Sequence, residues 1–116
     1  MSSPAFTLPA QDRDETAPYA LAGQARAKAG MADALETALL ALVEPTRAED
    51  GVLQYHVHRD RTDPDLFVFY EVRASTAHLE AHLSQPYVKE FLAKRHTMLA
   101  GDMDVRWLRM ASPYPA

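Results

Sequence analysis

The stretch LFVFYEV, residues 66–72, decides the fold of this chain. Successive side chains of a β-strand point to opposite faces of its sheet. Both faces of this strand are apolar, one through Leu66, Val68, Tyr70 and Val72 and the other through Phe67 and Phe69. Such a strand needs cover on both sides, so it predicts a sheet that is covered on each face.

The residues before this strand predict its partner. VLQYHVHR, residues 52–59, alternates between Leu53, Tyr55 and Val57 on one side and Gln54, His56 and His58 on the other. The segment between the two runs, DRTDPD, is rich in residues that favour turns. Two runs joined by a short polar turn predict a β-hairpin.

Further out, the pattern predicts two more strands and two helical regions. Residues 19–28 alternate as a strand, although their alanines also permit a helix, and residues 104–110 are a last strand. Residues 31–42, and 76–99 with a break at Ser84-Gln85-Pro86, have apolar residues at helical spacing. The order is that of a ferredoxin-like βαββαβ domain, an α+β fold with an antiparallel sheet.

The helices of such a domain cover only one face of its sheet. The two-sided strand leaves apolar residues on the other face, and no further segment is available to cover them. A second copy that packs sheet against sheet is the simplest cover. The sequence therefore predicts a homodimer, a dimeric α+β barrel.

The chain is predicted to be one domain with two short tails. Residues 1–18 contain three prolines and a DRDE cluster without sustained periodicity, so a flexible N-terminal tail is expected, with a docked arm as the alternative. The domain spans residues 19–110, and residues 111–116 are a C-terminal tail. Its 116 residues are a usual length for one domain.

Composition limits the classes of partner. The net charge of −4 gives no general attraction to nucleic acid. The chain has no cysteine, which excludes disulfides and thiolate chemistry. It has no apolar run long enough to cross a membrane and no signal-peptide pattern, so we expect no membrane contact and a cytoplasmic location.

Three stretches together resemble a known family. They are VEPTRAEDGVLQYHVHR (43–59), DPDLFVFYE (63–71) and ASTAHLEAHLSQPYVKEF (74–91). Their order and spacing resemble the antibiotic biosynthesis monooxygenase domain, of the quinol monooxygenase-like kind. The resemblance extends over residues 19–110.

The resemblance implies a dimeric ferredoxin-like fold and, for some members, oxidation of an aromatic phenol or quinol by O₂. Such an enzyme needs no cofactor, because the deprotonated substrate itself reduces O₂. The related haem-degrading branch places an iron-ligating histidine on the helix that here reads EFLAK. This chain has no histidine there before His96, so we expect neither haem nor metal.

His82 is the candidate catalytic base. It lies in the family-like stretch AHLSQP, and a histidine titrates near neutral pH. An ordinary helix histidine at a solvent edge is an equally good interpretation. His78 lies one turn earlier on the same helix face. A two-histidine metal site needs a further ligand, which the spacing does not supply.

Five further residues are candidates for substrate binding: Tyr55, His58, Tyr70, Glu71 and Arg73. The two tyrosines could direct hydroxyls into a pocket while their rings pack in the core, although core packing alone is the commoner outcome. His58 is a surface or interface residue unless it reaches the pocket. Glu71 shares a face with two phenylalanines and should pair with Arg73. Trp107, the only tryptophan, is expected in core or dimer packing.

Two other functions stay open. The same scaffold could bind a small apolar molecule without catalysis, or it could catalyse a cofactor-free isomerisation, because a fold does not fix its chemistry.

Overall fold

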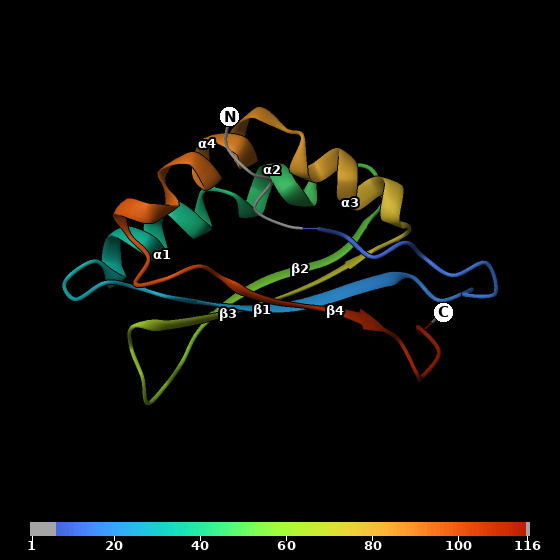
Figure 1. Ribbon diagram of the computed structural model, residues 1–116, viewed down its shortest axis with the longest axis horizontal. Coiled ribbons are helices and arrows are strands. Elements are labelled where there is room, and N and C mark those ends of the chain that lie inside the picture. Colours follow the sequence, from blue (N-terminus) through green and yellow to red (C-terminus); the bar gives the residue numbers. More distant parts are fainter. Residues whose placement is uncertain (1–6, 116) are drawn as a thin grey trace.

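In the computed structural model, which describes residues 7–115, four strands form one antiparallel sheet (Figure 1). The strands are β1 (Tyr19–Arg26), β2 (Val52–Arg59), β3 (Leu66–Arg73) and β4 (Asp104–Arg109), in the spatial order β2-β3-β1-β4. The predicted α+β ferredoxin-like fold is confirmed. Residues 19–26 form a strand, so the helical alternative for this segment was wrong.

The helices lie together on one face of the sheet (Figure 1). They are α1 (Ala32–Leu40), α2 (Val43–Arg47), α3 (Thr76–Leu83) and α4 (Pro86–Lys94), followed by a 3₁₀ turn, η1 (Arg95–Thr97). Ser75 caps α3 by accepting a hydrogen bond from the backbone N–H of His78. Pro86 begins α4, where its missing N–H costs nothing.

The last helix ends earlier than its apolar pattern predicted. It stops at Lys94, and after η1 the chain runs past buried Met98 to Leu99, which forms a β-bridge with Ala27. The backbone of residues 98 and 99 therefore pairs with the sheet margin, while both side chains are buried in the apolar core beneath the helices.

The two sides of β3 meet different surroundings. Phe67 and Phe69 are buried beneath the helices. The ring of Phe69 occupies the space above Gly23 on β1, where an added Cβ would lie 2.3 Å from it. Gly23 therefore leaves room for the Phe69 ring, because it has no side chain.

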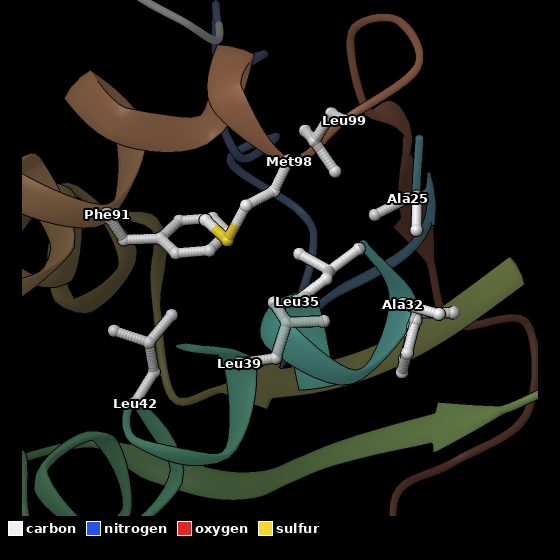
Figure 2. Close-up of a cluster of buried hydrophobic side chains, with 10 residues drawn as sticks. Ala25, Ala32, Leu35, Leu39, Leu42, Phe91, Met98 and Leu99 are labelled. Atoms are coloured by element: carbon white, nitrogen blue, oxygen red, sulfur yellow. The ribbon is translucent and has the colours of Figure 1, made fainter. Parts of the chain in front are cut away.

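An apolar core fills the half of the interior around α1. Leu35 and Leu39 of α1 pack there with Phe91 of α4 and with Met98 (Figure 2). Leu35 is fully buried. The amphipathic pattern of residues 31–42 arises from this contact.

On the opposite face of the sheet, Leu66, Val68 and Tyr70 of β3 are only partly buried. Leu108 of β4 is 40% exposed there. The helices that the structure describes all lie on the other face. This half-covered apolar surface is the one for which the sequence predicts a second copy, and the homodimer stays a prediction.

Several residues of the segment 7–18 contact the domain, and the choice between a flexible tail and a docked arm stays a prediction. Tyr19 donates a hydrogen bond from its hydroxyl to the Pro9 carbonyl at 2.7 Å. Gln11 contacts Thr76 at the start of α3, and Arg109 of β4 pairs with Asp12. Residues 1–6 of the predicted tail lie outside the described residues. Within residues 7–115, no helix has the length and apolar character needed to cross a membrane.

Candidate functional site

A cavity lies between the sheet and the helices, with a volume of about 580 Å³ that includes its open mouth. All four strands and the helices α1, α3 and α4 contribute to its wall. The lining residues are Leu21, Leu39, Leu42, Tyr55, Val57, Phe69, Glu71, Leu79, His82, Leu83, Val88, Phe91, Leu92, Met103, Val105 and Trp107. Its walls are therefore mainly aliphatic and aromatic.

The polar groups in this wall are few. Tyr55 comes from β2, Glu71 from β3 and His82 from α3, and all three side chains are buried. Mainly apolar walls with a few convergent polar groups are typical of small-molecule sites.

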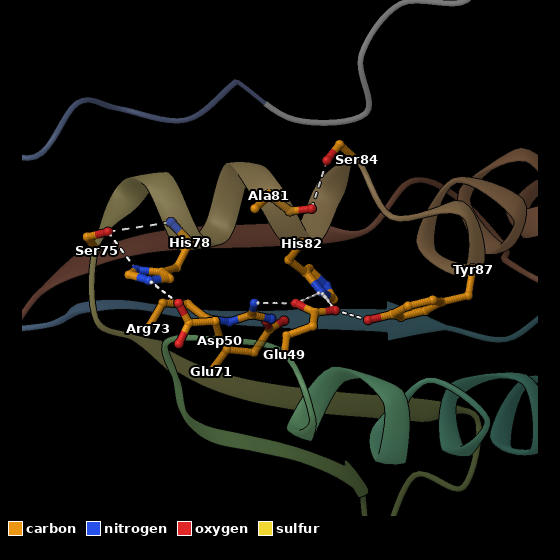
Figure 3. Close-up of polar contacts among 10 residues, drawn as sticks. All are labelled: Glu49, Asp50, Glu71, Arg73, Ser75, His78, Ala81, His82, Ser84 and Tyr87. Atoms are coloured by element: carbon orange, nitrogen blue, oxygen red, sulfur yellow. Dashed lines mark hydrogen bonds and ion pairs between the residues drawn. The ribbon is translucent and has the colours of Figure 1, made fainter.

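Behind the wall, Arg73 joins two carboxylates (Figure 3). Its guanidinium donates to Glu71 at 2.7 Å and to Glu49 at 3.2 Å. The arginine is fully buried, and the predicted ion pair with Glu71 is confirmed. A buried charge needs such partners, since an unpaired one is very costly.

The imidazole of His82 is bonded through Nδ1 to the carboxylate of Glu49, at 2.9 and 3.0 Å from its two oxygens (Figure 3). Burial lowers the pKa of His82, as does the nearby Arg73 charge, while Glu49 opposes this shift. The neutral imidazole is thus favoured near pH 7. For Nε2, no hydrogen bond to any residue in the range 7–115 is found.

Glu49 has a third partner in Tyr87, near the start of α4, whose hydroxyl donates a hydrogen bond to it (Figure 3). This carboxylate lies between α2 and β2, where Gly51 adopts a positive φ of 78°. His78 packs directly on Gly51 and pairs with Asp50 at 3.5 Å. Two histidines one turn apart on α3 therefore hold two successive acidic residues.

Tyr55 lies beside this network. Its ring centroid is 6.1 Å from that of His82. Burial raises the pKa of the Tyr55 phenol, and the Glu71 charge adds to the effect. The hydroxyl therefore stays protonated at neutral pH, and it lies close enough to the Thr46 side chain to interact with it.

Of the six residues singled out from the sequence, four lie together and two do not. Tyr55, Glu71 and His82 line the cavity, and Arg73 lies directly behind it. The expectation that His58 and Tyr70 face this cavity is corrected, because strand alternation turns them to the opposite face of the sheet. There Tyr70 lies opposite His56 and His58 lies opposite Val68, whose carbonyl the His58 ring contacts at 3.1 Å.

Sequence reasoning missed Glu49 and Tyr87, and it assigned Trp107 to packing although this side chain lines the cavity. Glu49 lies in a turn segment with no local pattern. The buried histidine, which must find a partner for its N–H, was the signal that could have prompted a search for an acidic residue.

No group of three or more acidic or histidine side chains within residues 7–115 converges as a metal site. His78 and His82, which share a helix face, hold different carboxylates instead of a common ligand.

Comparison with known proteins assigns the family. Residues 18–94 match the family model described as antibiotic biosynthesis monooxygenase. The chain belongs to this family. A solved structure, PA3566 from Pseudomonas aeruginosa, is 35% identical, with a TM-score of 0.79 over 83% of this chain and 96% of that one.

Two further proteins are similar to this chain. The structure of Rv0793 from Mycobacterium tuberculosis is 26% identical, with a TM-score of 0.76 over 86% of this chain and 98% of that one. The uncharacterized protein sll1783 of Synechocystis is 27% identical over 111 residues, which are 96% of this chain and 74% of the relative.

Proposed function

We propose that this protein is a cofactor-independent monooxygenase that oxidises a small aromatic phenol or quinol with O₂. One observation carries the proposal: a buried, neutral His82 lies in the wall of an apolar cavity, with one ring nitrogen bonded and the other without a described partner. That nitrogen can accept a proton from a bound substrate. Family membership supports the same reaction class.

The reaction begins with proton transfer from the substrate to Nε2 of His82. The resulting anion passes one electron to O₂, which gives a substrate radical and superoxide. The two recombine through a new C–O bond to form a peroxide at a ring carbon. The imidazolium of His82 returns its proton to the outer oxygen of this peroxide. The O–O bond then breaks as the carbon loses its hydrogen as a proton, which leaves a carbonyl on the carbon, and the departing hydroxide takes up that proton to leave as water.

The remaining groups support this chemistry in different ways. The Tyr55 hydroxyl can donate a hydrogen bond to the oxygen on which negative charge develops. The apolar walls exclude water and so keep the anion reactive toward O₂. Arg73 and Glu71 order the polar end of the cavity and do not transfer protons in this scheme.

Oxygen uptake tests the proposal. We expect the purified protein to consume O₂ with at least one member of a panel of hydroquinones and anthrones, and His82→Ala to lose about 10²-fold or more of this rate, the usual contribution of a general base. His96→Ala, which alters an exposed histidine of η1, is the matched control. Uptake that survives in His82→Ala would remove this residue from its role. Binding without uptake for every substrate would favour a binding protein.

We also propose that the open face of the sheet pairs with a second copy. Partly buried Val68 and Tyr70 lie at its centre, on the strand that first predicted the dimer. Val68→Glu should yield monomers in sedimentation at micromolar concentration, because a charge would then be buried in the interface. Leu40→Glu, on the exposed side of α1, should leave the dimer intact. Sedimentation of the unaltered protein as a monomer would contradict the proposal.

A further inference from the structure

We propose that Glu49 is the positioning residue for His82: its carboxylate holds the imidazole in the tautomer with hydrogen on Nδ1, which leaves Nε2 as the proton acceptor. The catalytic consequence rests on the proposed function. The tautomer itself follows from the contacts around the ring and can be tested without any substrate.

The geometry fixes which atom carries the hydrogen. Both oxygens of Glu49 lie within hydrogen-bond distance of Nδ1, at 2.9 and 3.0 Å. The side chains of His82 and Glu49 are only 6% and 11% exposed, so water competes little for this contact. An ionised carboxylate can only accept hydrogen bonds, and therefore Nδ1 must be the donor.

The other partners of Glu49 are also hydrogen-bond donors. Arg73 donates to Oε1 at 3.2 Å, and the Tyr87 hydroxyl donates to Oε2. Together with His82, these groups bring donors from β3, α3 and α4 to one carboxylate. Because Arg73 and Tyr87 both donate, the carboxylate serves as an acceptor toward every one of these partners.

The charges around His82 explain why Glu49 matters when the ring gains a proton. Arg73 disfavours a positive ring, while Glu49 and Glu71 favour it. The phenol of Tyr55 is neutral, and the Tyr87 hydroxyl is directed at Glu49. When Nε2 accepts the substrate proton, Glu49 stabilises the imidazolium across the existing bond, as the carboxylate of a serine-protease triad does.

The fold places this carboxylate firmly. Glu49 precedes Gly51, whose positive φ turns the chain into β2. A Cβ added to Gly51 would lie only 2.2 Å from the His78 ring, so this ring packs directly on the turn. His78 also pairs with Asp50. One helix, α3, therefore both carries the candidate base and holds the turn that orients it.

The test is ¹⁵N-resolved NMR of the histidine rings in the full chain, with pH titration, for the unaltered protein, Glu49→Gln and Glu44→Gln. We expect His82 of the unaltered protein to carry its hydrogen on Nδ1. In Glu49→Gln the pKa of His82 should fall further, because the carboxylate that favours the charged ring is gone. Glu44→Gln, which neutralises an exposed carboxylate on α2, should leave the His82 signals unchanged.

Two results would overturn the proposal. One is hydrogen on Nε2 of His82 in the unaltered protein, a result that stands even if Glu49→Gln does not fold. The other is an unchanged His82 titration in a folded Glu49→Gln. If a substrate is found, kcat/KM of Glu49→Gln should fall at least about tenfold, with its acidic limb moved to lower pH. Absence of oxygen uptake would remove the proposed function and leave the tautomer to be decided by NMR.

Discussion

The space between the helices and the sheet has two halves of opposite chemistry. Around α1, Leu35, Leu39 and Phe91 form an apolar core (Figure 2). Beside α3, the same layer buries Arg73 with Glu49 and His82 (Figure 3). Both halves are covered by helices and both lie on the same face of one sheet.

The two halves contribute differently to the stability of the fold. Burying apolar groups stabilises a fold directly, whereas burying charges costs solvation that their mutual attraction only partly returns. Replacing buried ion pairs by apolar groups is often neutral or stabilising. A polar half of this kind, next to a cavity, is therefore better explained by chemistry than by stability.

Among the variants that compare the two halves, Arg73→Ala should lower the free energy of unfolding the most. It leaves the carboxylates of Glu49 and Glu71 buried without their shared cation, and we expect a loss of about 3–5 kcal/mol in the free energy of unfolding. Urea denaturation measures it.

Arg26→Ala is the control for that variant. Its partner is Asp63, and the two side chains are 51% and 40% exposed, so the loss should be under about 1 kcal/mol. Equal losses in the two variants would mean that the buried ion pairs of Arg73 contribute no more to stability than an exposed pair.

Leu35→Ala tests the apolar half. This side chain is fully buried, and its truncation should cost about 2–5 kcal/mol. Because the residue does not line the cavity, the NMR signals of the His82 ring should stay in place while the protein is folded. A change in the His82 tautomer would show that the two halves are not separable.

A pair of glycine variants tests the turn that carries Glu49. Gly51 and Gly30 have φ values of 78° and 80°, so alanine at either position should cost about 1–2 kcal/mol. Gly51→Ala should cost more, because its Cβ would overlap the His78 ring, whereas nothing lies within 4 Å at Gly30. Thermal unfolding compares the two, and equal losses would contradict the packing of His78 on this turn.

The smallest effect is a pH dependence. Burial lowers the pKa of His82 below its ordinary value of 6.5, so the unfolded chain binds a proton that the folded chain does not. This contribution to stability is complete above about pH 6.5 and is lost as pH falls from there through the folded-state pKa. In His82→Gln, the free energy of unfolding should therefore change less with pH over this range than it does in His96→Gln. An unchanged slope would mean that His82 is not held neutral.

Patterns local to a segment predicted most of the fold. The alternation of residues 52–59 and the apolar strand at 66–72 indicated the hairpin, and Ser75 and Pro86 marked two helix starts. The end of α4 was not predictable in this way, because Met98 and Leu99 suit a helix face and a sheet margin equally well.

The candidate site was only partly predictable. The pairing of Glu71 with Arg73 followed from strand alternation, because both point toward the helices. The same rule, applied consistently, would have excluded Tyr70, which lies between Phe69 and Glu71. Glu49 depended on a tertiary contact with α3 across 33 residues, and no local pattern reports such a contact.

The central claim is that the cavity beside Glu49 and His82 receives a small aromatic molecule. Trp107 is the only tryptophan and lines this cavity, so its indole N–H gives a single, assigned NMR signal. Under anaerobic addition of a hydroquinone that supports oxygen uptake, we predict saturable shifts of this signal and of the His82 ring, with the Leu35 methyl signals unmoved. Saturable binding that moves neither the Trp107 nor the His82 signal would contradict the account.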